Sequence, residues 1–118
     1  MRRRPPRRCG VSSDNRPRAR QLLHPLITEK QWREAVVRFA EWHGWKVYWT
    51  WSSVHSPKGF PDLVLVRGER LIFAELKTEQ GVLRGPQEQW CQALMAVPCT
   101  EYFIWRPSDE DLVWALLR

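Results

Sequence analysis

At 118 residues, with 43% hydrophobic residues and a net charge of +6, the chain has room for one domain with a single modest core. No stretch approaches the roughly eighteen consecutive apolar residues of a membrane span, and the start lacks the apolar segment of a secretory signal. The three cysteines show neither CxxC nor CxxH spacing. We therefore expect no zinc site, no disulfide framework and a reducing location, cytoplasmic or nucleoid-associated.

All of the excess positive charge lies at the N-terminal end. Residues 1–24 contain eight arginines and one aspartate, a net charge of +7, whereas the remaining 11 basic and 12 acidic residues give −1. This Arg/Pro-rich segment is too polar to fold by itself, so we expect a flexible tail ahead of one domain at residues 25–118. Such tails bind nucleic-acid phosphates non-specifically; the alternative is a solubilising extension. The candidate DNA-binding residues of the tail are Arg2, Arg3, Arg4, Arg7 and Arg8.

The first helix of the domain is marked at both ends. Thr28 and Gln31 have the spacing of a capping box, and Gly44 suits a left-handed C-terminal cap, so a helix is predicted from about residue 28 to His43. Glu29 shares the sheet-facing side with the apolar stripe of this helix. Its carboxylate either meets a cation there or only favours the helix dipole in the first turn.

A strand and a polar loop follow this helix. The alternation over Trp45–Trp51 predicts a strand, and the segment 52–61, with Ser, Pro, Lys and Gly, reads as a loop that leads into Asp62. Loops next to catalytic residues often contact the substrate. The candidate nucleic-acid contacts here are His55, Ser56 and Lys58 for phosphate, with Trp49 and Trp51 for stacking on a base.

Two apolar runs, Leu63–Val66 and Leu71–Ala74, predict a β-hairpin. Gly68 suits the first position of a two-residue type II′ turn, where φ is positive. With Gly68-Glu69 as the loop, Asp62 lies opposite Glu75, with the two Cβ atoms about 5 Å apart. A three-residue loop would instead turn one carboxylate to the other face.

Opposed carboxylates favour a cation between them. Like charges in cross-strand pairs are destabilising, and Mg²⁺ prefers one or two carboxylates with waters and a substrate phosphate. Lys77, two residues beyond Glu75, shares their face and could stabilise a phosphate transition state or orient water. The alternative is that Glu75 and Lys77 are only the polar rim of an edge strand.

The rest of the chain adds two helices and a strand. Gly85-Pro86 opens a second helix with Pro at its first position, Tyr102–Trp105 reads as a fourth strand, and Ser108 begins a final helix through Leu117. The predicted order is α-β-β-β-α-β-α. This is an α/β fold with a mixed central sheet flanked by helices.

Pro61-Asp62, the hairpin and Glu75-x-Lys77 together resemble the PD-(D/E)xK nucleases, and the flanking residues are similar to the VRR-NUC branch of that superfamily. The similarity spans about residues 28–117. The matching residues are Thr28-Glu29, Gly44–Tyr48, Gly59–Arg67, Ala74–Glu79, Gly81, Gln87, Trp90 and Trp105–Pro107.

The resemblance implies a restriction-endonuclease-like core and a metal-dependent nuclease. It implies Asp62, Glu75 and Lys77 as catalytic residues, with Glu29 as an additional acidic residue and Gln87 as a supporting one. The implied ligands of Mg²⁺ or Mn²⁺ are Asp62, Glu75, Glu29 and the backbone carbonyl of Leu76. Relatives often carry a histidine where this chain has Trp49, so this chain has no histidine at that position.

The expected function is that of a Mg²⁺-dependent endodeoxyribonuclease. Stand-alone relatives of this size tend to cut branched or structured DNA, often as homodimers, so DNA and a second copy are the expected partners. One alternative is a DNA-binding module that keeps the fold without catalysis, although the intact Asp-Glu-Lys set argues against it. The other is a nuclease directed at RNA.

Overall fold

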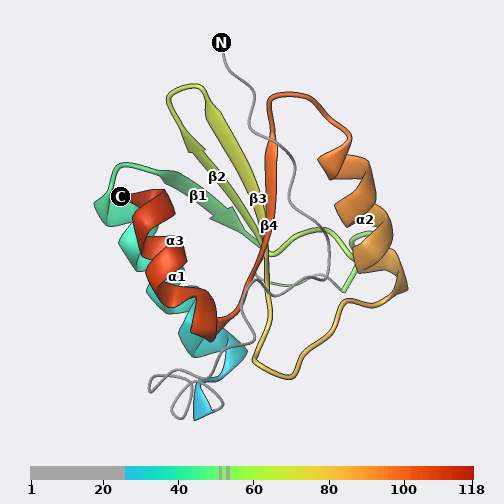
Figure 1. Ribbon diagram of the computed structural model, residues 1–118. Coiled ribbons are helices and arrows are strands. Elements are labelled where there is room, and N and C mark those ends of the chain that lie inside the picture. Colours follow the sequence, from blue (N-terminus) through green and yellow to red (C-terminus); the bar gives the residue numbers. More distant parts are fainter. Residues whose placement is uncertain (1–25, 51, 53) are drawn as a thin grey trace.

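The computed structural model describes residues 26–50, 52 and 54–118 (Figure 1). In chain order the elements are α1 (Glu29–Trp42), β1 (Lys46–Trp49), β2 (Leu63–Arg67), β3 (Arg70–Leu76), α2 (Gly85–Met95), β4 (Glu101–Trp105), the 3₁₀ helix η3 (Pro107–Asp109) and α3 (Glu110–Leu117). The predicted order α-β-β-β-α-β-α is confirmed, with the short η3 added before the last helix. The chain is an α/β protein.

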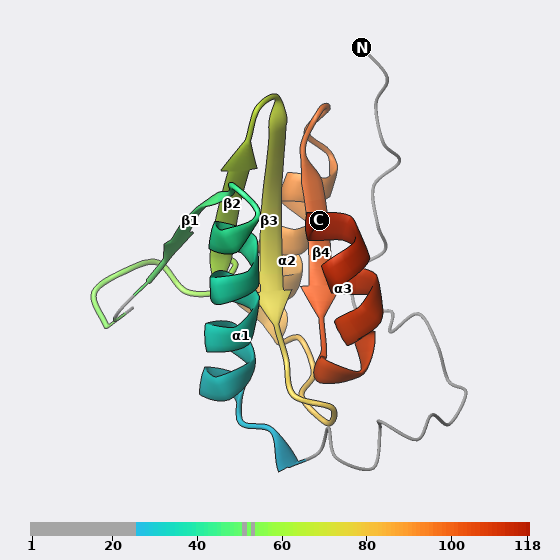
Figure 2. The ribbon, with the colours of Figure 1, turned by 90° about the vertical axis from the view of Figure 1, so that its left-hand side faces the viewer.

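The four strands form one mixed sheet in the order β1-β2-β3-β4. β1 and β3 both pair antiparallel with β2, whereas β4 runs parallel to β3. Helices α1 and α3 lie side by side on one face of the sheet, and α2 covers the other (Figures 1 and 2). The parallel pair requires a crossover, and α2 provides it.

The main core lies between the sheet and the helices α1 and α3. Alternate residues of β3, Ile72, Ala74 and Leu76, are fully buried on this face. Trp32 of α1 donates from its indole nitrogen to the carbonyl of Trp105 at 3.0 Å, and Trp45 donates to that of Leu117 at 2.8 Å. These indoles therefore fix both helices relative to the sheet as well as filling its core.

The predicted hairpin and the first helix are confirmed at their ends. Gly68 and Glu69 form the two-residue loop, with Arg67 opposite Arg70, and Gly68 has φ 59°. Glu69 keeps a negative φ, which agrees with type II′ and excludes type I′. The Thr28–Gln31 capping box is present, with both bonds formed at 3.0–3.1 Å.

Three local predictions are wrong. The first strand ends at Trp49, because its partner β2 begins at Leu63, the residue that pairs with Trp49. Ser108 does not begin the last helix: it lies in η3, where the Asp109 carboxylate accepts from the Arg106 backbone N–H. Cys91 is disulfide-bonded and buried, against the expectation that the cysteines stay unpaired.

The strand prediction also included Trp51, which lies outside the described residues, as do the tail and its arginines. No helix in the described part of the chain has the length and apolar content needed to cross a bilayer.

Candidate functional site

The β2–β3 hairpin brings Asp62 and Glu75 together as its register predicts. Leu63 lies opposite Ala74, so the next pair along the ladder is Asp62 and Glu75. Asp62 is not itself part of β2. Its Oδ2 accepts a hydrogen bond from the backbone N–H of Leu76 at 2.8 Å, which holds the carboxylate against the end of β3.

Glu75 is a buried carboxylate with incomplete hydrogen bonding. Its side chain lies on the face covered by α2 and is 3% exposed. Oε2 accepts from the Gln87 amide at 3.1 Å and lies 3.8 Å from the Lys77 ammonium. Oε1 is buried, and as a carboxylate oxygen it accepts no hydrogen bond from the described residues. Such an oxygen costs free energy unless a proton or a cation satisfies it.

The electrostatics agree with this geometry. The pKa of Glu75 is raised to about 9, and burial is the largest cause. The negative charge of Asp62 and a side-chain hydrogen bond to Asp62 also raise this pKa. In the absence of a cation, Glu75 is therefore protonated at neutral pH, and its side chain is hydrogen-bonded to that of Asp62. Tyr102, on neighbouring β4, has a raised phenol pKa, first through burial and then through the charges of Glu75 and Asp62. Around Glu75, Asp62 and Tyr102, negative charge is therefore not fully balanced by positive charge.

Gln87 connects Glu75 to Lys77. While its amide nitrogen donates to Glu75, its Oε1 accepts from Lys77 Nζ at 3.0 Å and from the backbone N–H of Arg84 at 3.0 Å. Arg84 is the N-cap of α2, so Gln87 also caps that helix from its third position. One side chain therefore fixes the helix start and orients both neighbours. The sequence pattern places Gln87 near the buried edge of the helix but does not reveal this bridge.

Glu29 lies near the Asp62–Glu75 carboxylate pair but is not grouped with it. Its side chain is exposed at the start of α1, yet its pKa is raised by partial burial and then by the charge of Asp62, while Lys77 and Arg33 lower it. In the described part of the chain, no three His, Cys, Asp or Glu side chains are grouped as a metal site. Glu29 is therefore a neighbour of the carboxylate pair and not a third member of its cluster.

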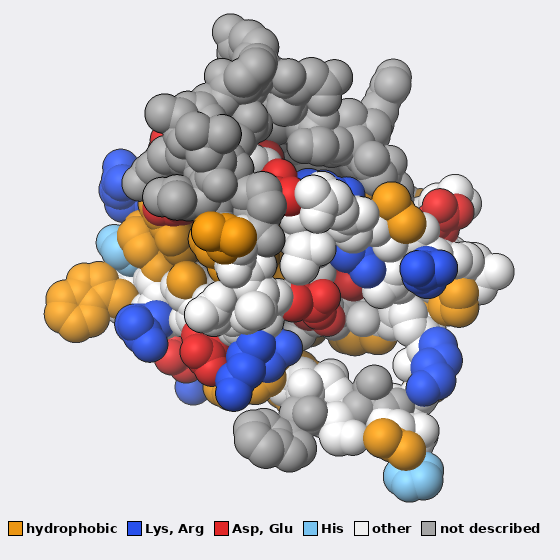
Figure 3. Space-filling view, turned by 90° about the horizontal axis from the view of Figure 1, so that it is seen from below, with side chains coloured by type: hydrophobic (Ala, Val, Ile, Leu, Met, Phe, Trp, Pro, Cys, Tyr) orange, Lys and Arg blue, Asp and Glu red, His pale blue; other side chains and the backbone are white. Residues whose placement is uncertain are grey.

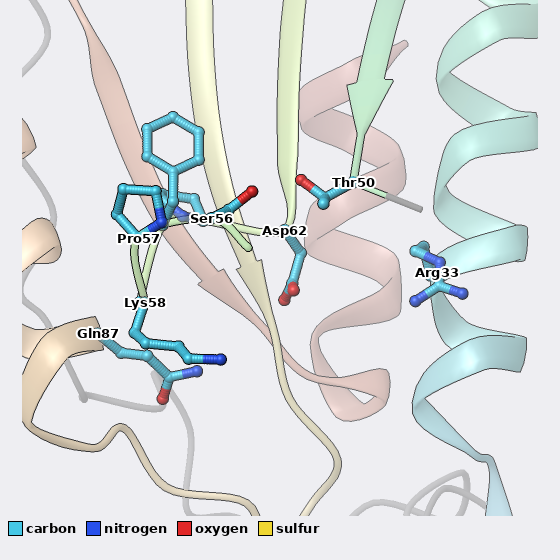
Figure 4. Close-up of a pocket in the computed structure, with 10 residues that line it drawn as sticks. Arg33, Thr50, Ser56, Pro57, Lys58, Asp62 and Gln87 are labelled. Atoms are coloured by element: carbon cyan, nitrogen blue, oxygen red, sulfur yellow. The ribbon is translucent and has the colours of Figure 1, made fainter. Parts of the chain in front are cut away.

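A pocket of about 290 Å³ opens beside Asp62 (Figure 4). Helix α1 contributes Arg33, Thr50 follows directly after β1, and α2 contributes Gln87; the segment from Ser56 to Asp62 forms the rest of the wall. Seen from this end of the sheet, acidic side chains lie near the middle of the face with Lys and Arg side chains around them (Figure 3).

Gly59 holds the pocket loop against α2. Its φ of +90° is unfavourable for other residues, and an added Cβ would lie against the backbone carbon of Pro86, at 2.4 Å. Phe60 then packs edge-on against Phe73 and Trp90, at centroid distances of 5.9 and 5.0 Å. The loop that carries Lys58 is therefore seated on the same helix that carries Gln87.

A second clamp holds the loop after Lys77. The guanidinium of Arg106 donates to the carbonyls of Thr78 and Gly81, both at 2.6 Å. The backbone N–H of Lys77 donates to the Trp105 carbonyl at 3.1 Å and so continues the β3–β4 ladder. Lys77 thus extends from a fixed backbone position.

The predicted nucleic-acid contacts divide into three groups. Ser56 and Lys58 line the pocket, whereas His55 is exposed on the same loop and does not. Trp49 is 39% exposed at the end of β1 and lies outside the pocket. Trp51 and the arginines of the tail lie outside the described residues. Arg33, which the sequence pattern does not single out, is the additional cation.

The residues present fit a divalent cation. Asp62 Oδ2 is occupied by the Leu76 N–H and Glu75 Oε2 by Gln87, which leaves the buried Glu75 Oε1 beside a second carboxylate with no donor among the described residues. Two carboxylates with room for water are the donor set that Mg²⁺ accepts. The backbone carbonyl of Leu76, at the same end of β3, remains a predicted ligand.

In comparisons with protein-family models, curated proteins and solved structures, nothing matches this chain.

Proposed function

We propose that this protein is a metal-dependent nuclease that hydrolyses DNA phosphodiester bonds. The observation that carries the proposal is the buried Glu75 carboxylate, with one oxygen lacking a donor, paired with Asp62 and linked through Gln87 to Lys77. The resemblance of the Pro61-Asp62 and Glu75-x-Lys77 motifs to the PD-(D/E)xK nucleases, VRR-NUC branch, supports the same assignment.

Asp62 and Glu75 would hold the ion, with the Leu76 carbonyl as a further ligand. A bound Mg²⁺ or Mn²⁺ would supply Lewis-acid stabilisation of the phosphate and a lowered pKa for water. A structural role alone explains this pair poorly. Without a metal, the pair must either hold a proton at neutral pH or leave a buried oxygen unsatisfied, at a cost of about 1–3 kcal/mol.

Lys77 provides positive charge beside the carboxylates. Its ammonium is held by Gln87 Oε1 at 3.0 Å and is 3.8 Å from Glu75, so it is positioned before substrate arrives. In phosphodiester hydrolysis, such a group stabilises charge that develops on the phosphoryl oxygens or orients the attacking water. Glu29, whose pKa is raised in part by Asp62, would tune the charge of the site.

Cleavage assays with matched variants test this function. The substrates are single-stranded, duplex, flap and four-way-junction DNA, each with Mg²⁺, Mn²⁺ or EDTA, and a matched RNA strand separates the RNA alternative. We expect cleavage that requires the metal and is abolished by Asp62→Asn and Lys77→Ala, with folding retained. Cleavage in EDTA, or at the wild-type rate by either variant, would contradict the proposal.

A further inference from the structure

The pocket beside Asp62 has cations on opposite walls. Arg33 approaches from α1, and Lys58 comes from the loop before β2, with Asp62 between them (Figure 4). Among the described residues of the lining, Asp62 is the only acidic one. Thr50 and Ser56 add hydroxyl groups, which can donate to an anion.

Among the described residues, neither Arg33 nor Lys58 has a partner that accounts for its position. In the described part of the chain, no hydrogen bond or ion pair engages the Arg33 guanidinium or the Lys58 ammonium. Arg33 follows Glu29 by one helical turn, and the two charges influence each other, yet these two side chains form no ion pair. Both cations are therefore available to a ligand.

The lining of the pocket favours a backbone phosphate over a base. Phe60, the one aromatic residue among its described lining, is already packed against Phe73 and Trp90, so it is not free to stack. The remaining polar groups are the kinds that bind phosphate oxygens irrespective of sequence.

We propose that Arg33 and Lys58 form a subsite for the DNA backbone phosphate next to the one positioned at Asp62 and Glu75. The inference rests on the proposed nuclease function and adds a specificity element to it. The DNA strand passes between α1 and the 56–61 loop, and the protein binds its backbone without reading base edges. Arg33 and Lys58 are binding residues, whereas the carboxylate pair and Lys77 perform the chemistry.

Affinity measured without catalysis tests this subsite. Fluorescence anisotropy with a labelled single-stranded DNA, in EDTA and over a range of salt, compares the wild-type chain with Arg33→Gln and Lys58→Gln. The matched control is Arg38→Gln, which removes the same charge from an exposed position of the same helix. We expect each pocket variant to lose affinity by about tenfold at low salt, as for a charged hydrogen bond. The slope of log K against log salt should fall by about 0.7 for each phosphate interaction removed.

The controls separate the possible failures. Arg38→Gln should change affinity less than about twofold, and Arg33→Lys should recover part of the loss because it keeps the charge. Equal losses in Arg33→Gln, Lys58→Gln and Arg38→Gln would overturn the subsite, as would wild-type affinity in both pocket variants. If the wild type cleaves DNA with Mg²⁺ but both pocket variants bind DNA with wild-type affinity, the subsite is wrong and the nuclease proposal stands. Pocket-dependent binding by a wild type that never cleaves would instead overturn the nuclease proposal.

Discussion

Gln87 is the residue on which the geometry of the candidate site depends most. It donates to Glu75 and accepts from Lys77, and no other described side chain forms a hydrogen bond with both. We predict that Gln87→Ala lowers the cleavage rate by about tenfold to a hundredfold, the usual effect of removing a residue that orients metal ligands. The measurement is single-turnover cleavage at saturating Mg²⁺. Gln89→Ala, exposed on the same helix, is the control and should keep the wild-type rate. An unchanged rate for Gln87→Ala would remove it from the site.

Glu75 should also determine how stability depends on pH. Its pKa is about 9 in the folded chain and has an ordinary value of 4.5, so the folded state retains a proton that the unfolded state releases. The stability associated with this proton is complete below about pH 4.5 and is lost as pH rises through about 9.

Chemical denaturation in EDTA at a series of pH values measures this effect. We expect the wild type to lose stability across that window and Glu75→Gln to lose much less, because its amide carries no titrating proton. Glu69→Gln, in the exposed hairpin turn, controls for the loss of one carboxylate and should follow the wild type. Parallel curves for the wild type and Glu75→Gln would show that the buried carboxyl does not titrate in this range.

Among the structural elements, the 56–61 loop and α2 should behave as one unit. Gly59 and Gly68 both have positive φ. A Cβ added at Gly59 would meet the backbone of Pro86 at 2.4 Å, whereas a Cβ added at Gly68 would meet nothing within 4 Å. Gly68→Ala should therefore cost only the local strain of about 1–2 kcal/mol. Gly59→Ala should cost more and also lower activity, because the loop must move away from the helix that carries Gln87.

Urea denaturation and cleavage rates of the two alanine variants make this comparison. The expected pattern is a nearly wild-type rate for Gly68→Ala and a clearly lower one for Gly59→Ala. Equal stability losses, with activity retained in both, would show that the packing of the loop on α2 is unimportant.

The elements were largely predictable because their signals are local. The capping box at Thr28, the turn at Gly68 and the proline after Gly85 each act within a few residues. The turn at Gly68 alone sets the hairpin register and with it the Asp62–Glu75 pairing. Arg33 was not predictable, since on a helix it looks like any solvated charge until the loop folds opposite to it. The end of β1 at Trp49 was not predictable either, because it is set by the start of β2 at Leu63, which is distant in the sequence.

Across the whole chain, the excess positive charge is concentrated at the N-terminal end. Residues 1–24 carry a net charge of +7, and the rest of the chain carries −1. We predict that deleting the tail weakens DNA binding most at low salt, with the salt slope falling by about 0.9 for each phosphate interaction that the deletion removes on duplex DNA. The measurement is affinity over a salt series for the full-length and truncated chains. Turnover at saturating DNA should barely change, since Asp62, Glu75 and Lys77 lie in the body. Equal slopes would indicate that the tail only aids solubility.

The proposed function depends above all on Asp62 and Glu75 forming a site for a divalent cation. Because Glu75 is protonated at neutral pH without the ion, binding should release a proton. Calorimetric titration with Mn²⁺ at pH 7, repeated in buffers of different ionisation enthalpy, measures both affinity and proton release. We predict one bound ion with close to one proton released in the wild type, binding retained in Lys77→Ala, and no binding in Glu75→Gln. Absence of Mn²⁺ binding by the folded wild type, or equal binding by Glu75→Gln, would contradict the proposed metal site.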